Sequence, residues 1–232
     1  MSNPHEFIKM PQSTKPQTNE ELGSYLNGLN ETQLQAVKSL DGPFLILAGA
    51  GTGKTRTLTT RLAHILLKGK ARPWEILAVT FTNKAAREMQ NRVSKIFNNK
   101  VVGLPWLGTF HSICAKILRR HSNAVNLNQN FTIIDQDDQL RLIKTICNAE
   151  NIDIKKISPN FIISLINKWK NFGWYPDDVI LKKSESLERN LLKIYKIYQT
   201  KLTNLNACDF GDLILHCVSI FEKNTDIIEL YS

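Results

Sequence analysis

A glycine-rich run from Ala48 to Thr55, reading Ala-Gly-Ala-Gly-Thr-Gly-Lys-Thr, has the residue types and spacing of a phosphate-binding loop, with Ala48 replacing the usual first glycine. Gly51 and Gly53 let backbone N–H groups turn toward a phosphate, and a following helix would present its positive N-terminus. Lys54 can reach the β and γ phosphates, and the Thr55 hydroxyl is a ligand for Mg²⁺. The run therefore predicts binding of a nucleoside triphosphate with Mg²⁺.

Hydrolysis at such a loop also needs a carboxylate at the end of an apolar strand to hold the metal ion. The best candidate is Phe131–Asp135, FTIID, but this run is short and the residues that follow it have a helical pattern that Asp135 would cap. Capping is the favoured interpretation, and the metal-ligand interpretation stays open. Because no other apolar run of strand type ends in an acid, we expect the acidic strand to be missing from this chain.

Two junctions between a strand and a helix, Thr80–Met89 (TFTNKAAREM) and Gly108–Ser112 (GTFHS), offer hydroxyls, amides and a phenylalanine each. Such groups at the rim of a sheet suit a phosphodiester backbone, and Phe81 and Phe110 can stack on bases. The alternative is that each junction is a capped helix with a phenylalanine in the core. His111 by itself is better explained as a surface helix residue than as a catalytic base.

The elements that must position these residues alternate between strand and helix. Apolar runs at 43–47 and 75–82 predict strands buried on both faces, and helices are expected at about 53–67 and 83–97. A helix before them begins at Asn30, with Gln33 in the capping-box position. This βαβα order predicts an α/β fold with a parallel sheet.

From Thr109 onward the periodicity is mainly helical. Helices are expected to begin at Thr109, at Asp135 and at Ser158 with Pro159, and a long helix should cover about 187–205. The segment 167–176, NKWKNFGWYP, interleaves lysines with aromatic residues, which is one pattern of a nucleic-acid surface. Its apolar helical spacing favours core positions for most of the aromatic side chains and solvent for the lysines.

The chain has 232 residues, of which 42% are hydrophobic and 22% charged, and its net charge is +9. The positive charge favours a polyanionic partner, although a merely soluble basic surface would look the same. Residues 1–20 are polar and proline-punctuated and predict a disordered leader. The sequence shows neither a signal peptide nor a membrane span, and its four cysteines lack metal-site spacing, so we expect a cytoplasmic protein with reduced thiols.

Five motifs, LNETQLQAV, LAGAGTGKTRTL, VTFTNKAAREM, GTFHS and CDFGDLI, in this order from about Leu29, together resemble superfamily 1 DNA helicases of the UvrD/PcrA/Rep type. The resemblance implies a P-loop NTPase (RecA-like) domain 1A at 21–112, a mainly helical domain 1B inserted at 113–206, and a return to 1A at 207–232. It also implies an ATP-dependent enzyme that translocates 3′ to 5′ on single-stranded DNA and unwinds duplexes at junctions in repair and replication, with unidentified repair or replication proteins as further partners.

The resemblance also assigns roles to individual residues. Lys54 and Thr55 would be catalytic, with Thr55 as a metal ligand for Mg²⁺, and Gln33 would read the adenine edge of ATP. The nucleotide-binding set is Gln33, Ala50, Gly51, Thr52, Gly53, Lys54, Thr55 and Arg56. The set facing DNA is Phe81, Thr82, Asn83, Lys84, Thr109, Phe110 and His111. Asp209, Phe210 and Asp212 match the segment that returns to domain 1A.

The sequence departs from the family pattern because the strand ending Asp-Glu and the arginines of the second RecA-like domain are absent. We therefore expect the chain to bind ATP as the N-terminal portion of a helicase, with little activity by itself. Two other classes stay open. One is a self-contained P-loop kinase or ATPase that uses Asp135 as its metal acid, and the other is a module that binds DNA or protein without hydrolysis.

Overall fold

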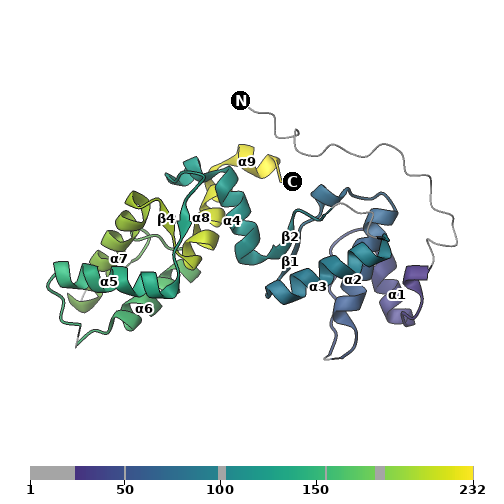
Figure 1. Cartoon of the computed structure of the whole chain (residues 1–232), viewed down its shortest axis with the longest axis horizontal. Coiled ribbons are helices and arrows are strands. Elements are labelled where there is room, and N and C mark those ends of the chain that lie inside the picture. Colours follow the sequence, from purple (N-terminus) through teal and green to yellow (C-terminus); the bar gives the residue numbers. More distant parts are fainter. Residues whose placement is uncertain (1–23, 50, 99–102, 155, 181–185, 232) are drawn as a thin grey trace. The chain divides into compact units, whose positions relative to one another are not determined.

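The computed structural model describes residues 24–49, 51–98, 103–154, 156–180 and 186–231 (Figure 1). The chain divides into two compact units. The first comprises the described residues up to Ala78 together with Lys84–Leu107, and the second comprises Val79–Asn83 together with the described residues from Gly108 onward. The leader expected over residues 1–20 lies outside the described residues.

Among its described residues, the first unit contains three α-helices and short 3-10 turns, and the division between the units falls within two short strands. The α-helices are α1 (Glu31–Lys38), α2 (Lys54–Leu67) and α3 (Asn83–Ile96), and the turns are η1 (Ser24–Leu26) and η2 (Pro73–Glu75). Strand β1 (Ala78–Thr80) pairs with β2 (Leu107–Thr109). The capping box predicted for α1 is confirmed, because Asn30 accepts from the Gln33 N–H and Gln33 accepts from the Asn30 N–H.

The core of the first unit lies between α2, α3 and the segment that leads into β2. Ala86, Met89 and Val93 are buried on α3 at the spacing that the sequence predicts for one face of this helix. They pack with Leu62 of α2 and with Leu104 and Leu107. This packing fixes α3, which follows Thr80–Thr82, against α2, which follows the glycine-rich loop.

The expected buried strand at 43–47 is not formed, and this prediction was wrong. Phe44, Leu45 and Leu47 are 48%, 80% and 87% exposed, and the segment is irregular. The strand expected at 75–82 shortens to β1, with Leu77 63% exposed. A strand buried in a parallel sheet needs hydrogen-bonded neighbours and covering helices, and no strand among the described residues pairs with 43–47.

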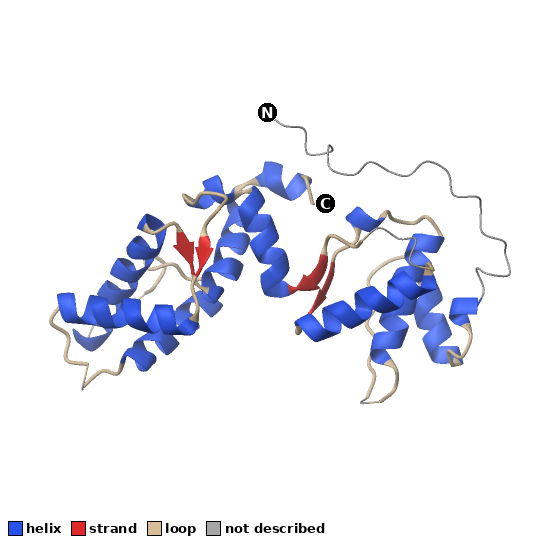
Figure 2. Ribbon diagram, in the orientation of Figure 1, coloured by secondary structure: helices blue, strands red, loops and turns tan. Residues whose placement is uncertain are grey.

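The second unit is mainly helical, with strands that are very short (Figure 2). Its elements are α4 (Phe110–Arg120), η3 (Ser122–Val125), β3 (Thr132–Ile133), α5 (Gln136–Ala149), α6 (Pro159–Asn171), α7 (Ser186–Asn204), β4 (Ala207–Cys208), α8 (Phe210–Lys223) and α9 (Thr225–Glu229). The predicted starts at Thr109, Asp135 and Ser158 are confirmed as N-caps. Strands β3 and β4 run parallel, with Thr132 opposite Ala207.

The core of the second unit forms where α5, α6 and α7 pack together. Trp169 is buried and stacks on Tyr195 with ring centroids 5.6 Å apart, which confirms the predicted core position of this tryptophan. Phe172 and Trp174 instead are exposed and stack on each other. The solvated position expected for Lys170 was wrong, because this side chain is buried. Helical spacing could not reveal the carboxylates that draw it inward.

The chain has a mixed fold of helices with small sheets, and the described residues contain no helix long and apolar enough to span a membrane. Helix α8 packs against α4 and α6, so the structure groups the residues after 207 with the helical second unit. The division into domain 1A, domain 1B and a returning segment stays a prediction.

Candidate functional site

The phosphate loop, residues 48–55, leads directly into the N-terminus of α2. Gly51 and Gly53 have φ angles of 76° and 82°, in the left-handed region that favours glycine. Gly53 is the N-cap of α2, and no side chain caps this end of the helix. The N–H groups of the first turn lack intrahelical partners, so they remain available to an anion.

Lys54, the first residue of α2, folds its ammonium back over the loop. Its Nζ donates to the carbonyl oxygens of Ala48 and Gly49 at 2.9 and 2.7 Å. The Thr52 hydroxyl also donates to Gly49, at 2.8 Å, and braces the turn. The structure therefore presents a cation, an uncapped helix end and left-handed glycines together, and this set fits the phosphates of a nucleotide.

The loop is tied to the segment before it by two side chains from the predicted nucleotide set. Gln33 Nε2 donates to the Thr52 carbonyl at 2.9 Å, and an Arg56 guanidinium nitrogen donates to the Asn27 carbonyl at 2.8 Å. A Cβ at Gly53 would lie 3.0 Å from Gln33 Nε2, and the positive φ of Gly53 also favours glycine at this position. The contact with Asn27 has no sequence signal. Ala50 lies outside the described residues.

Of the predicted ligands for Mg²⁺, the phosphate loop supplies the Thr55 hydroxyl but no carboxylate. Thr55 is exposed on the first turn of α2 beside Lys54, where a hydroxyl can serve as a metal ligand. The described residues contain no group of three His, Cys, Asp or Glu side chains that could hold a metal ion. Asp135 belongs to the second unit, where its Oδ1 accepts from the Asp138 N–H at 2.9 Å. The capping interpretation of Asp135 is confirmed.

Four aromatic residues of the second unit, here called the aromatic rim, form two ring pairs. Phe81 is 93% exposed and its ring centroid lies 5.9 Å from that of Phe110, which is 44% exposed. His111 lies edge-on to Phe210, with centroids 5.9 Å apart and Phe210 53% exposed. The alternative that Phe81 and Phe110 are core residues is therefore wrong.

Phe110 and Phe210 occupy equivalent places in the fold. Each is the first residue of a helix, follows a short strand, and is preceded by a capping residue, Thr109 before α4 and Asp209 before α8. Phe210 is not among the residues that the sequence predicts to face DNA. The repeated order of strand, cap and phenylalanine in LGTF and ACDF is the signal that could have found it.

The remaining residues of the predicted DNA-facing set lie between β1 and the start of α3. Thr82, Asn83 and Lys84 are exposed. Lys84 lines a solvent-open hollow of about 630 Å³ on α3, together with Arg87, Glu88, Asn91, Arg92 and Lys95. The structure thus places the predicted DNA-facing residues at the surface, except that Thr109 is half-buried as the cap of α4.

Comparison with known proteins places residues 29–232 within the model of the UvrD/REP helicase N-terminal domain. The chain is 41% identical over 210 residues to the ATP-dependent DNA helicase PcrA of Staphylococcus aureus (strain Mu50 / ATCC 700699), covering 90% of this chain and 29% of that protein. It is 42% identical over 206 residues to PcrA of Bacillus subtilis (strain 168), covering 89% and 28%. PcrA of Leuconostoc citreum is 40% identical over 205 residues, covering 88% and 27%. The chain therefore spans less than a third of the length of these relatives.

Proposed function

Because the chain belongs to the UvrD/REP helicase family, matching its N-terminal domain, we propose that it is the ATP-binding portion of a 3′ to 5′ DNA helicase. The observation that supports the proposal is the phosphate loop, whose left-handed glycines, lysine and uncapped helix end lie together within the matched region and suit an anion. The relatives are named ATP-dependent DNA helicases, and we extend that activity to the protein to which these residues belong.

In this proposal the triphosphate lies on the N-terminus of α2. When nucleotide binds, Lys54 Nζ gives up its hydrogen bonds to the two loop carbonyls and donates to phosphate oxygens instead. The N–H groups of the first turn of α2 donate to the same phosphate oxygens. Thr55 would hold Mg²⁺, which when bound neutralises charge on the β and γ phosphates. Gln33 and Arg56 hold the loop to the preceding segment, and Gln33 would also contact the adenine edge.

The aromatic rim supplies the contact with single-stranded DNA. Exposed rings stack on bases of any sequence, which suits a protein that moves along a strand. Thr82, Asn83, Lys84 and the cap Thr109 would contact the phosphodiester backbone and fix its path. We propose single strands and junctions with duplex DNA as substrates, repair or replication proteins as further partners, and the cytoplasm as the location.

Hydrolysis and unwinding are proposed for the whole protein and not for these 232 residues alone. In the sequence, Phe131–Asp135 is the best candidate for an apolar strand that ends in an acid, and Asp135 caps α5 instead. Binding of nucleotide can still occur, because phosphate contacts come from the loop and α2.

The test is phosphate release from ATP with Mg²⁺, measured with and without oligothymidine beside the Lys54→Ala variant. We expect negligible turnover, together with thermal stabilisation by ADP that Lys54→Ala reduces. DNA-stimulated release that both Lys54→Ala and Asp135→Asn abolish would instead support a self-contained ATPase. DNA affinity that persists without any nucleotide effect would support a non-hydrolysing binding module.

A further inference from the structure

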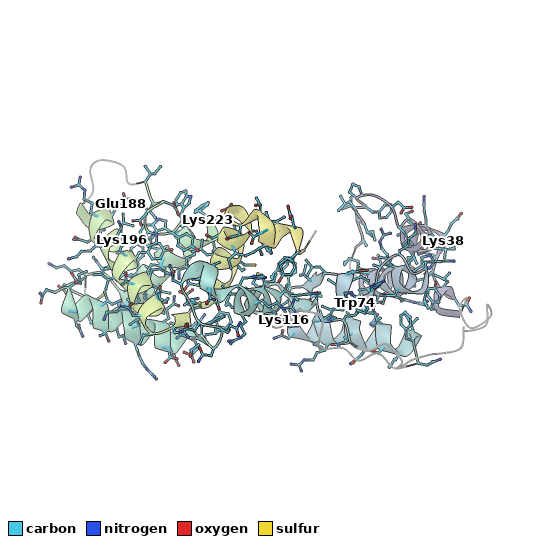
Figure 3. All side chains as sticks on the ribbon, turned by 90° about the horizontal axis from the view of Figure 1, so that it is seen from above. Lys38, Trp74, Lys116, Glu188, Lys196 and Lys223 are labelled. Atoms are coloured by element: carbon cyan, nitrogen blue, oxygen red, sulfur yellow. The ribbon has the colours of Figure 1, made fainter. Side chains whose placement is uncertain are left out.

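Lys170, near the C-terminal end of α6, places its ammonium in the interior of the second unit. Its side chain is 0% exposed, whereas Lys196 of α7 and Lys223 of α8 are exposed (Figure 3). Lys170 Nζ lies 2.7 Å from Asp209 Oδ2 and 2.7 Å from Asp212 Oδ1. Burying a cation with two carboxylates carries a desolvation cost that apolar side chains of similar volume would avoid. Filling the interior therefore does not by itself explain why these three charged side chains are buried.

The two carboxylates are the capping box of α8. Asp209 Oδ1 accepts from the Asp212 N–H at 2.9 Å, and Asp212 Oδ2 accepts from the Asp209 N–H at 3.1 Å. Each carboxylate thus uses one oxygen to hold the first turn of α8 and the other to hold Lys170. Phe210 lies between these two aspartates in the sequence, so its backbone belongs to the turn that they fix.

Three helices converge on this turn. Asp209 Oδ2 also accepts from Tyr198 Oη of α7 at 2.8 Å and from Gln139 Nε2 of α5 at 3.1 Å. Gln199 of α7 donates to Asp212 Oδ1 at 2.7 Å. The start of α8 is therefore held by side chains of α5, α6 and α7 through one buried cluster.

The packing around the turn leaves little freedom for it to shift. A Cβ at Gly211 would lie 3.0 Å from Lys170 Cδ and 3.3 Å from Asp209 Oδ1. Burial opposes ionisation of Asp212, but the charges of Lys170 and His216, together with hydrogen bonds from Lys170 and the Asp209 N–H, lower the pKa of this carboxyl. Phe110 at the equivalent place on α4 has only the neutral cap Thr109, whose Oγ1 accepts from the Ser112 N–H at 3.2 Å. The charged cluster thus distinguishes the anchoring of Phe210 from that of Phe110.

We propose that Lys170 is a positioning residue: by bridging Asp209 and Asp212 it fixes the first turn of α8, and so holds Phe210 edge-on to His111 in the orientation that stacks on a DNA base. The last step rests on the proposed function. The first step, the orientation of the ring pair, can be measured without DNA.

The first experiment is NMR of the His111 imidazole protons, which the nearby Phe210 ring shifts. Phe210→Ala gives the resonance positions without that ring. We expect Asp209→Asn, which keeps a capping side chain but weakens the pairing with Lys170, to move the resonances toward those positions. The matched control is Tyr175→Phe, which removes the hydroxyl hydrogen-bonded to His216 but no donor to either aspartate, and it should leave them unchanged. Unchanged His111 resonances in Asp209→Asn would overturn the proposal.

The second experiment is a double-mutant cycle in oligothymidine binding, measured by fluorescence anisotropy at one salt concentration. Phe210→Ala should weaken binding about 5- to 150-fold. Lys170→Met should lower the affinity for oligothymidine by a similar factor. If both residues act through the same ring, the affinity of the double variant should be no lower than that of the single variant with the lower affinity. Independent, multiplicative losses would mean that Lys170 acts on stability alone and would overturn the proposal.

Because Lys170→Met leaves two buried carboxylates without their cation, it can fail to fold. In that case the cycle uses Asp209→Asn, judged folded by circular dichroism, with the same expected coupling and the same overturning result. If Phe210→Ala binds oligothymidine as the wild type does, the DNA role of Phe210 fails while the NMR result still decides the positioning of the ring.

Discussion

The two candidate sites of this chain are built in opposite ways. The phosphate loop of the first unit is exposed, and its lysine and threonine side chains bond to the loop's own carbonyls. The Phe210 end of the aromatic rim is anchored by charges in the interior of the second unit. The difference shows that a site made from backbone N–H groups needs correct local conformation, whereas a site made from exposed rings needs a rigid scaffold behind it.

The largest expected effect is on the stability of the second unit, which holds Phe210. Lys170→Met should lower the free energy of unfolding of the second unit by about 3–5 kcal/mol, because two buried carboxylates lose their partner. Urea denaturation followed by tryptophan fluorescence and circular dichroism measures this loss. Lys54→Ala, which removes an exposed lysine, should not shift the urea denaturation curve when no nucleotide is present. An unchanged midpoint for Lys170→Met would break the comparison.

The next effect is on ligand binding at the phosphate loop. At a nucleotide concentration of 100 times Kd, ATP with Mg²⁺ should stabilise the wild type by about 2.7 kcal/mol. Lys54→Ala should remove most of this gain, because the ammonium no longer reaches the phosphates. Thermal melts with and without nucleotide measure it, and Lys68→Ala at the other end of α2 is the matched control. Equal stabilisation of Lys54→Ala and wild type would remove Lys54 from the site.

A third effect concerns the less anchored end of the aromatic rim. Phe110→Ala should weaken oligothymidine binding by about 1–3 kcal/mol, because one stacking ring is lost. Its melting temperature should change little, since the ring is 44% exposed. Phe161→Ala, at a similarly exposed position of α6, is the control and should bind normally. Lower stability with normal binding would instead identify Phe110 as a structural residue.

The smallest effect is a pH dependence of the second unit. Burial lowers the pKa of His216, and the nearby Asp212 carboxylate only partly offsets this, while Tyr175 Oη lies 2.7 Å from Nδ1. Because the folded pKa is below the unfolded value of 6.5, the unfolded chain binds more protons at acidic pH. The stability that His216 contributes is thus present above pH 6.5 and is lost as the pH falls below it.

Thermal melts between pH 7.5 and 5.5 measure this dependence. His64 and His121 also have lowered pKa values caused first by burial, so part of the loss should remain in His216→Gln. The comparison is therefore the difference between the two pH profiles. A His216→Gln profile that parallels the wild type would show that this histidine does not contribute.

Local signals in the sequence predicted the helices well. The caps Asn30, Thr109, Asp135 and Ser158 all begin helices where the sequence indicated, because a cap bonds to N–H groups two or three residues away. The strand at 43–47 failed for the opposite reason. Its apolar composition indicates burial, but a strand depends on neighbours that are distant in the sequence.

The sequence by itself determined the phosphate loop and its lysine, since glycines at fixed spacing before a helix are a local requirement of anion binding. Motif order also determined the family resemblance. Only the tertiary structure decided that Lys170 is buried, that Asp209 and Asp212 pair with it, and that Phe210 meets His111. These contacts join residues 39 to 99 positions apart in the chain, and such distances are set by packing, which no local pattern encodes.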